Sequence, residues 1–145
     1  MPPTTRLQTV RDVLGHGFRD PRLLLRACTH ASMVDANAPA AERLEAANER
    51  LEFLGDTLLG AAVGETLFHR HPTASEGRMS RWRARLVSRA TLARAMEQHA
   101  LLAVCRVGEQ VPTPWPDSVK ANLAESILAA IYLDGGWEPL RTAVA

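Results

Sequence analysis

The chain has 145 residues, of which 46% are hydrophobic and only 5% aromatic, and its formal net charge is +1 at pH 7. This length and composition predict one soluble globular domain that buries a core of its own. No apolar run of about 18 residues is present, which excludes a membrane-spanning helix, and we expect no signal peptide.

Abundant Ala and Leu, with few aromatic residues, favour helices packed on helices. Asp20-Pro21 is a helix start signal, Gly15 is a stop signal, and the alternating prolines of 111–116 exclude regular structure there. In chain order, the pattern predicts helices over 7–14 and 21–28, a loop at 37–39, one long helix over 40–69, helices capped by Ser75 and Ser88, an irregular loop over 111–116, and a last helix begun by Asp117 or Ser118 and ended by Gly135-Gly136.

The expected long helix carries carboxylates along one edge. At about 100° per residue, positions i, i+4, i+7 and i+11 share one side of a helix, and the apolar residues share the other. The acidic positions are Glu45, Glu49, Glu52 and Asp56, opposite Leu51, Leu54 and Leu58. For Glu45 and Glu49 a solvated acidic stripe is an equal alternative. Glu52 and Asp56 lie among apolar residues, so we expect Asp56 to be partly buried and the pair to need a cation or a base.

A second polar pair lies in the expected last helix. Asn122 and Glu125 are three residues apart, so they are neighbours on one helical face. The surrounding core positions are Leu123, Ile127, Leu128 and Ile131. Facing helices of a bundle can direct such carboxylates toward two metal ions, whereas a surface charge or a structural ion pair is the alternative for Glu125.

Charge is segregated along the sequence. Acids dominate residues 42–65, and residues 70–94 form a basic block. The arginines of this block are Arg70, Arg78, Arg81, Arg83, Arg85, Arg89 and Arg94. Any single one of them is best explained as part of a solvated helix face. The cluster as a whole suits a polyanion such as the backbone of a nucleic acid.

Two segments carry a family resemblance. Residues 48–56 read NERLEFLGD, and residues 121–136 read ANLAESILAAIYLDGG. They resemble the ribonuclease III signature NERLEFLGD and the family's later helix A-D-x-x-E-A-x-x-G-A-x-Y-L-D-G. Further segments similar to family motifs are T-H-x-S at 29–32, F-x-x-x-P at 68–72, E-G-x-[LM]-S-x-x-R at 76–83 and L-V-S at 86–88. The resemblance covers roughly residues 8–143.

The resemblance implies an all-α endonuclease domain, a helical bundle that forms a homodimer. It further implies a cytoplasmic, metal-dependent endoribonuclease that hydrolyses double-stranded RNA and leaves 5′-phosphate and 3′-hydroxyl ends. Mg²⁺ would be the metal, with Mn²⁺ as a substitute. The implied site residues are Glu52, Asp56, Asn122 and Glu125 as metal ligands, Asp56 and Glu125 as catalytic residues, Glu49, Arg78, Arg81 and Arg85 as RNA contacts, and Phe53 at the dimer interface. A core position within one subunit is the alternative for Phe53.

Asn122 departs from the family pattern, which usually has Asp there. An amide oxygen can ligate a hard cation but brings no charge, so metal affinity should be lower. The alternative function is therefore a weakened or inactive relative that binds structured RNA, as ribosome-associated members of the fold do. A di-iron carboxylate bundle is less suitable, because it would need histidines three residues after the glutamates, where this chain has Gly55 and Leu128.

The domain organisation follows from the same pattern. We expect residues 1–145 to form a single ribonuclease III-like endonuclease domain, with no double-stranded RNA-binding domain in this chain. Cys28 and Cys105 are too few for a disulfide framework or a usual zinc site, so they should be reduced core residues of a cytosolic protein.

Overall fold

The structure is a computed structural model that describes residues 3–46 and 48–145. The described part of the chain is helical, and its one β-type contact is an isolated parallel bridge between Thr29 and Arg106. Its α-helices are α1 (Pro3–Leu14), α2 (Pro21–Ala27), α3 (Ala40–Ala46), α4 (Glu49–Arg70), α5 (Glu76–Leu86), α6 (Arg89–Gln98), α7 (Asp117–Gly135) and α8 (Trp137–Val144), and its 3-10 turns are η1 (Ala31–Met33) and η2 (Leu101–Val104). The predicted all-α fold is confirmed.

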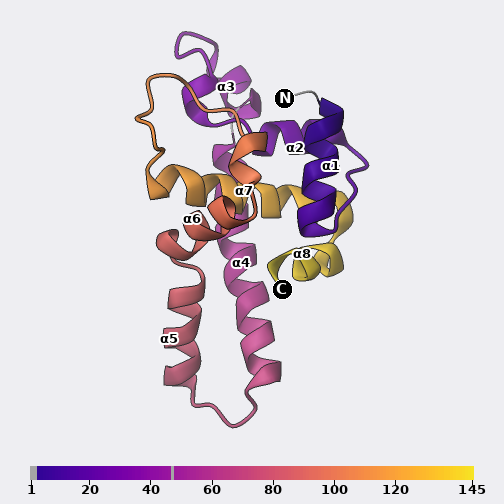
Figure 1. The fold of residues 1–145 in the computed structure, drawn as a ribbon, viewed down its shortest axis with the longest axis vertical. Coiled ribbons are helices and arrows are strands. Elements are labelled where there is room, and N and C mark those ends of the chain that lie inside the picture. Colours follow the sequence, from indigo (N-terminus) through magenta and orange to yellow (C-terminus); the bar gives the residue numbers. More distant parts are fainter. Residues whose placement is uncertain (1–2, 47) are drawn as a thin grey trace.

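Helix α7 is the centre of the bundle. It runs across α4 and packs against α2, α6 and α8 as well (Figure 1). A helix enclosed in this way must be apolar on most of its circumference, and α7 is. The core residues predicted on it, Leu123, Ile127, Leu128 and Ile131, are all buried. Side chains that α7 directs at α4 and α6 are therefore held in a rigid setting.

The second half of α4 and the whole of α5 form an arm. Figure 1 shows these two helices side by side, projecting away from the other helices and joined by the turn after α4. Ser75 begins α5 by accepting a hydrogen bond from the amide of Arg78. No residue of α5 is buried, so this helix exposes most of its surface.

Local end signals were predicted well. Asp20 and Ser88 cap α2 and α6 by accepting hydrogen bonds from the amides of Arg22 and Thr91. Gly15 follows α1 with a φ of +77°, a left-handed conformation that a residue with a Cβ adopts only with strain. The cap predicted for α7 is wrong, because the helix begins directly after Pro116 and neither Asp117 nor Ser118 makes a side-chain cap.

The single long helix predicted over 40–69 is wrong. The structure has two helices, α3 and α4, and residue 47 between them lies outside the described residues. The amide of Asn48 donates to the carbonyl of Thr29 at 3.1 Å instead of to a carbonyl one turn earlier, and α4 then starts with the bond from Glu52 to the Asn48 carbonyl at 2.8 Å. Glu45 is on α3, so it does not share an edge with the acids of α4 and stays a solvated charge.

Two findings concern membrane spans and cysteines in the described part of the chain. No helix among them is both long enough and apolar enough to cross a bilayer. Cys28 is buried, Cys105 is half-buried, and both are free thiols.

Candidate metal and RNA-cleavage site

Helices α4 and α7 touch backbone to backbone at Gly55. A Cβ placed on Gly55 would lie 1.8 Å from the carbonyl oxygen of Glu125, far inside any real contact distance. Only glycine allows two helices to approach this closely. The crossing point therefore lies between the acidic positions of α4, Glu52 and Asp56, and directly at Glu125 of α7.

A buried hydrogen-bond network joins the helices a short distance from the crossing. The side-chain amide of Asn48 donates to Ser126 Oγ at 2.9 Å, and Ser126 Oγ lies 2.8 Å from the carbonyl of Asn122 and 3.2 Å from that of Asn48. Asn48 is 1% exposed and Ser126 is fully buried. The start of α4 is thus fixed to the turn of α7 that carries Asn122 and Glu125.

The acids of the two helices interact electrostatically. Burial raises the pKa of Glu125 to about 7, with further contributions from the negative charges of Asp56 and Glu52, while Arg89 opposes the rise. Burial also raises the pKa of Glu52, and Glu49 and Asp56 add to that effect. Excess negative charge in a partly desolvated site is the condition in which a bound cation is most favourable.

Solvent exposure differs among the four predicted ligands. Glu52, Asn122 and Glu125 are half-buried, as side chains that line a site should be. Asp56 is exposed, so its predicted partial burial is wrong. The reason is that the residues after Asp56 on its helix include small residues such as Ala61 that face solvent, and the sequence gives no sign of this.

The donor set suits a hard divalent cation, since it consists of carboxylate and amide oxygens. Within the described ranges, however, no group of three His, Cys, Asp or Glu side chains is close enough to hold a metal ion. The structure therefore brings together Glu52, Asp56 and Glu125 as interacting charges on two crossing helices, and it does not arrange them as a closed cage.

Comparison with known proteins decides the family. A family model described as Ribonuclease-III-like matches residues 20–145. This chain belongs to the ribonuclease-III-like family. Ribonuclease 3 of Rhodopirellula baltica is 38% identical over 138 residues, covering 94% of this chain and 49% of that protein. Ribonuclease 3 of Ectopseudomonas mendocina is 40% identical over 134 residues, covering 90% of this chain and 54% of that protein. The chain spans about half the length of these curated relatives.

Solved structures agree with this assignment. The nuclease domain of ribonuclease III from Campylobacter jejuni superimposes with a TM-score of 0.81 at 31% identity, over 94% of this chain and 92% of that one. That structure is described as showing flexibility in a region involved in dimer formation. The all-α fold of this chain is therefore that of a ribonuclease III nuclease domain.

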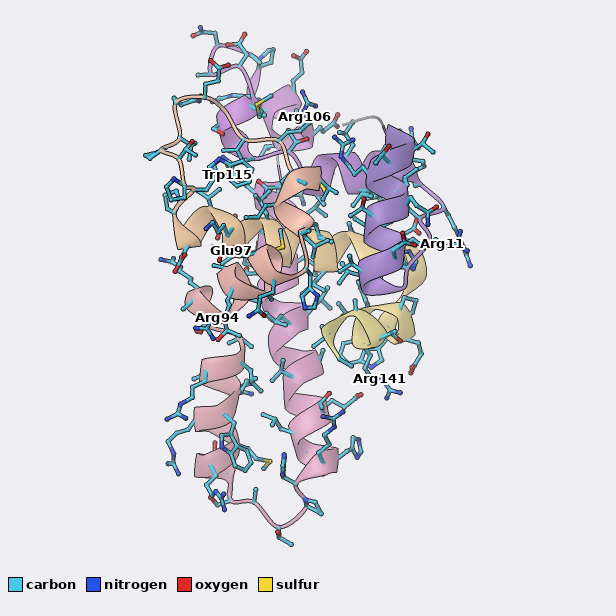
Figure 2. The ribbon with its side chains drawn as sticks, in the orientation of Figure 1. Arg11, Arg94, Glu97, Arg106, Trp115 and Arg141 are labelled. Atoms are coloured by element: carbon cyan, nitrogen blue, oxygen red, sulfur yellow. The ribbon has the colours of Figure 1, made fainter. Side chains whose placement is uncertain are left out.

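Arg89 is a residue of this ribonuclease-III-like site that sequence reasoning did not single out. It is the first residue of α6, and its charge acts on both Glu52 and Glu125. Farther along α6, Glu97 forms an ion pair with the buried Lys120 of α7 (Glu97 is labelled in Figure 2). From the sequence, Arg89 could be assigned only to the basic block. Its nearness to Glu52 and Glu125 depends on how α6 packs against α7.

The predicted RNA contacts lie in two places. Arg78, Arg81 and Arg85 are exposed on α5, and their spacing of i, i+3 and i+7 puts them on one face of the arm, from which nitrogen-bearing side chains project into solvent (Figure 2). The guanidinium of Arg78 also lies 4.9 Å from the ring centre of Trp82. Glu49 is exposed at the opposite end of α4 from the turn that leads into α5, so it is not part of this basic face.

Phe53 does not belong to the core of its own chain. Its side chain is 79% exposed, which excludes the alternative of an internal core position. Thr57, Ala61 and Phe68 continue the same side of α4, and all are exposed. We name these four residues the α4 stripe. A large exposed aromatic side chain on such a stripe is typical of a surface that another protein surface covers.

Proposed function

We propose that this chain is the nuclease unit of a metal-dependent endoribonuclease that cleaves double-stranded RNA. The observation that carries the proposal is the crossing of α4 and α7 at Gly55, which places Glu52, Asp56 and Glu125 in one electrostatically coupled group. The similarity to proteins named Ribonuclease 3 supports endoribonuclease activity. The proposed products carry 5′-phosphate and 3′-hydroxyl ends.

Four side chains would hold the metal, which we propose to be Mg²⁺, with Mn²⁺ as a substitute: Glu52, Asp56, Asn122 and Glu125. The bound metal would supply an activated water and neutralise charge that develops on the phosphodiester oxygens. Burial raises the pKa of Glu125 to about 7 in the metal-free protein, so binding of the metal near neutral pH would displace a proton from this carboxyl group. Asp56 and Glu125 are the proposed catalytic residues.

The basic face of the arm would hold the substrate. Double-stranded RNA is recognised mainly through phosphates and 2′-hydroxyls, for which exposed guanidinium groups are suitable donors. Arg78, Arg81 and Arg85 provide three such groups on one face. Glu49 lies at the start of α4, close in sequence to the proposed ligand Glu52 and far from the arm. We propose that its side chain also contacts the RNA.

A homodimer would cover the α4 stripe. The Campylobacter jejuni nuclease domain is described as dimer-forming, and the family resemblance implies that the matching aromatic enters a cavity of the partner. An apolar cleft of about 640 Å³ lies beside α4 in this chain, lined among others by Leu59, Val63, Met96 and Leu128. This volume is ample for a phenyl ring, so we propose that each subunit inserts Phe53 into the cleft of the other. Two sites in one dimer would then cut both RNA strands.

Asn122 supports a second candidate, a relative that binds structured RNA without cleaving it. The amide removes one of four negative charges, and the described residues contain no ready-made cluster of three metal-binding acids. Incubation of a long RNA duplex with the protein in Mg²⁺ or in EDTA separates the two functions. Mg²⁺-dependent shortening of the duplex with ligatable 5′-phosphate ends supports the nuclease, whereas a gel shift without shortening supports the binding protein.

A further inference from the structure

Ser126 is unusual in this chain. The ribonuclease III pattern has Ala after the glutamate of the later helix, whereas this chain has a serine whose side chain is fully buried. A buried hydroxyl needs hydrogen-bond partners, and Ser126 has three within 3.2 Å: the side-chain amide of Asn48 and the carbonyls of Asn122 and Asn48. Its hydroxyl is therefore fully engaged between two helices.

The direction of each bond follows from the donors available. A serine hydroxyl has one hydrogen to donate and two lone pairs to accept with. Ser126 Oγ accepts from Asn48 Nδ2, and its single hydrogen is shared between the Asn122 carbonyl at 2.8 Å and the Asn48 carbonyl at 3.2 Å. Every buried side-chain nitrogen and oxygen of the described residues has a hydrogen-bond partner. Removal of the Ser126 hydroxyl would take away the acceptor of Asn48 Nδ2 and leave that buried nitrogen without its bond.

Asn48 extends the connection to the acids of α4. Its carbonyl accepts the first helical hydrogen bond of α4, from the amide of Glu52 at 2.8 Å, and also faces Ser126 Oγ. Ser126 follows Glu125 directly and is bonded to the carbonyl of Asn122. Asn48, the residue before α4, and Ser126 of α7 thus link the backbone amide of Glu52 to the turn of α7 that carries the two proposed ligands.

We infer that Asn48 and Ser126 are a positioning pair that fixes the distance between the α4 and α7 ligand groups of the metal site. The inference rests on the proposed function for the identity of the ligands. It adds a specific role for two residues that touch neither metal nor substrate. The break between α3 and α4 gives the pair a role in this chain, because the amide of Asn48 bonds to Thr29 and not to a carbonyl of α3. Residues behind the ligands of a metal site typically affect metal affinity by about 10- to 100-fold.

The test is Mn²⁺ binding to Ser126→Ala, Asn48→Ala and the double variant, measured by calorimetry well below each melting temperature. We expect Ser126→Ala to raise the Kd for Mn²⁺ by about 10-fold, and the double variant to bind no more weakly than the weaker single variant. Thr66→Val is the matched control, since Thr66 Oγ1 also donates to a carbonyl four residues earlier, at 3.0 Å, but far along α4 from the acids. Its Kd should stay within twofold of wild type.

A purely structural role would lower the melting temperature without changing the Mn²⁺ affinity of the folded protein. Unchanged affinity in Ser126→Ala would therefore overturn the positioning pair, even if Asn48→Ala fails to fold. So would wild-type protein that binds no Mn²⁺. Duplex RNA cleavage is followed in parallel: wild-type protein that binds Mn²⁺ but does not cleave would contradict the proposed function alone, and the positioning pair is still decided by the ratio of the Mn²⁺ constants.

Discussion

Replacing Gly55 with alanine tests the geometry on which the site depends. The added Cβ would lie 1.8 Å from the Glu125 carbonyl oxygen and 2.5 Å from its carbonyl carbon, and both atoms belong to the backbone of α7. Ordinary contact for a Cβ begins at 3.4 Å, so the helices would have to separate by about 1.6 Å. No side-chain rotation can relieve the clash, because none of the three nearest atoms belongs to a side chain.

Two opposing effects set the expected size of the loss. Overpacking in a core typically costs about 1–3 kcal/mol, whereas alanine gains up to about 1 kcal/mol over glycine inside a helix. The overlap here is with rigid backbone, so we expect net destabilisation by about 2 kcal/mol and a melting temperature lower by several degrees. Displacing catalytic groups by about 1 Å can cost about 10²-fold in rate, so cleavage should fall at least that far.

Thermal melting and Mg²⁺-dependent cleavage of duplex RNA are the assays, with Gly60→Ala as the stability control on the same helix. A Cβ at Gly60 would meet no atom within 4 Å of its own chain, so this variant should melt at or above the wild-type temperature. The close crossing would be refuted by a Gly55→Ala protein that melts and cleaves like wild type.

Other predictions concern individual residues of the site and of the dimer surface. Glu125→Ala should lower the cleavage rate by at least about 10²-fold with the fold intact by circular dichroism, since a metal ligand and charge partner is worth several multiples of about 1.4 kcal/mol; cleavage within a few-fold of wild type would show that the metal site is assigned wrongly. Phe53→Ala should shift the dimer toward monomer in light scattering at tens of micromolar, and a wild type that is monomeric there would contradict the interface. Asn122→Asp should lower the half-saturating Mg²⁺ concentration for cleavage, because it adds a negative oxygen at the cation; an unchanged or higher requirement would count against Asn122 as a ligand. Mn²⁺ should bind more tightly as pH rises through about 7, with proton release near pH 6, because the metal needs the ionised form of Glu125, whose pKa is raised to about 7; calorimetry that finds the same pH dependence in Glu125→Gln would assign the proton to another group.

Local signals in the sequence predicted local structure. Asp20, Ser75 and Ser88 begin their helices as expected, because a cap depends only on one side chain and a backbone amide two or three residues later. The nine-residue signature and the later helix pointed to the two segments that cross at Gly55 and Glu125, and the metal-binding roles of their residues stay predictions. The extent of α4 was not, because the bonds of Asn48 reach Thr29 and Ser126, which are distant in sequence.

The apolar residues of α4 did not show in the sequence which of them are buried in the core and which are exposed. The residues after Asp56 read like a core segment, yet Ala61 and Phe68 face outward and leave Asp56 exposed. Obligate subunit interfaces are more apolar than the rest of a protein surface, so the sequence of such a surface can resemble that of a core segment. Arg89 was missed because it is close to Glu52 and Glu125 in space but not in sequence. The packing of α6 brings its positive charge near them, where it opposes the rise in the pKa of both carboxyl groups.

The crossing of α4 and α7 also ties assembly of the site to the order in which the chain is made. Synthesis proceeds from the N-terminus, so α4 is complete long before Glu125 leaves the ribosome. Contacts between segments so far apart in sequence form late, after a long loop has closed. An unfinished or truncated polypeptide that ends before α7 therefore carries Glu52 and Asp56 but no partner for them. The four proposed ligands come together only once α7 has docked on α4, so a fragment without α7 would lack half of the proposed metal site.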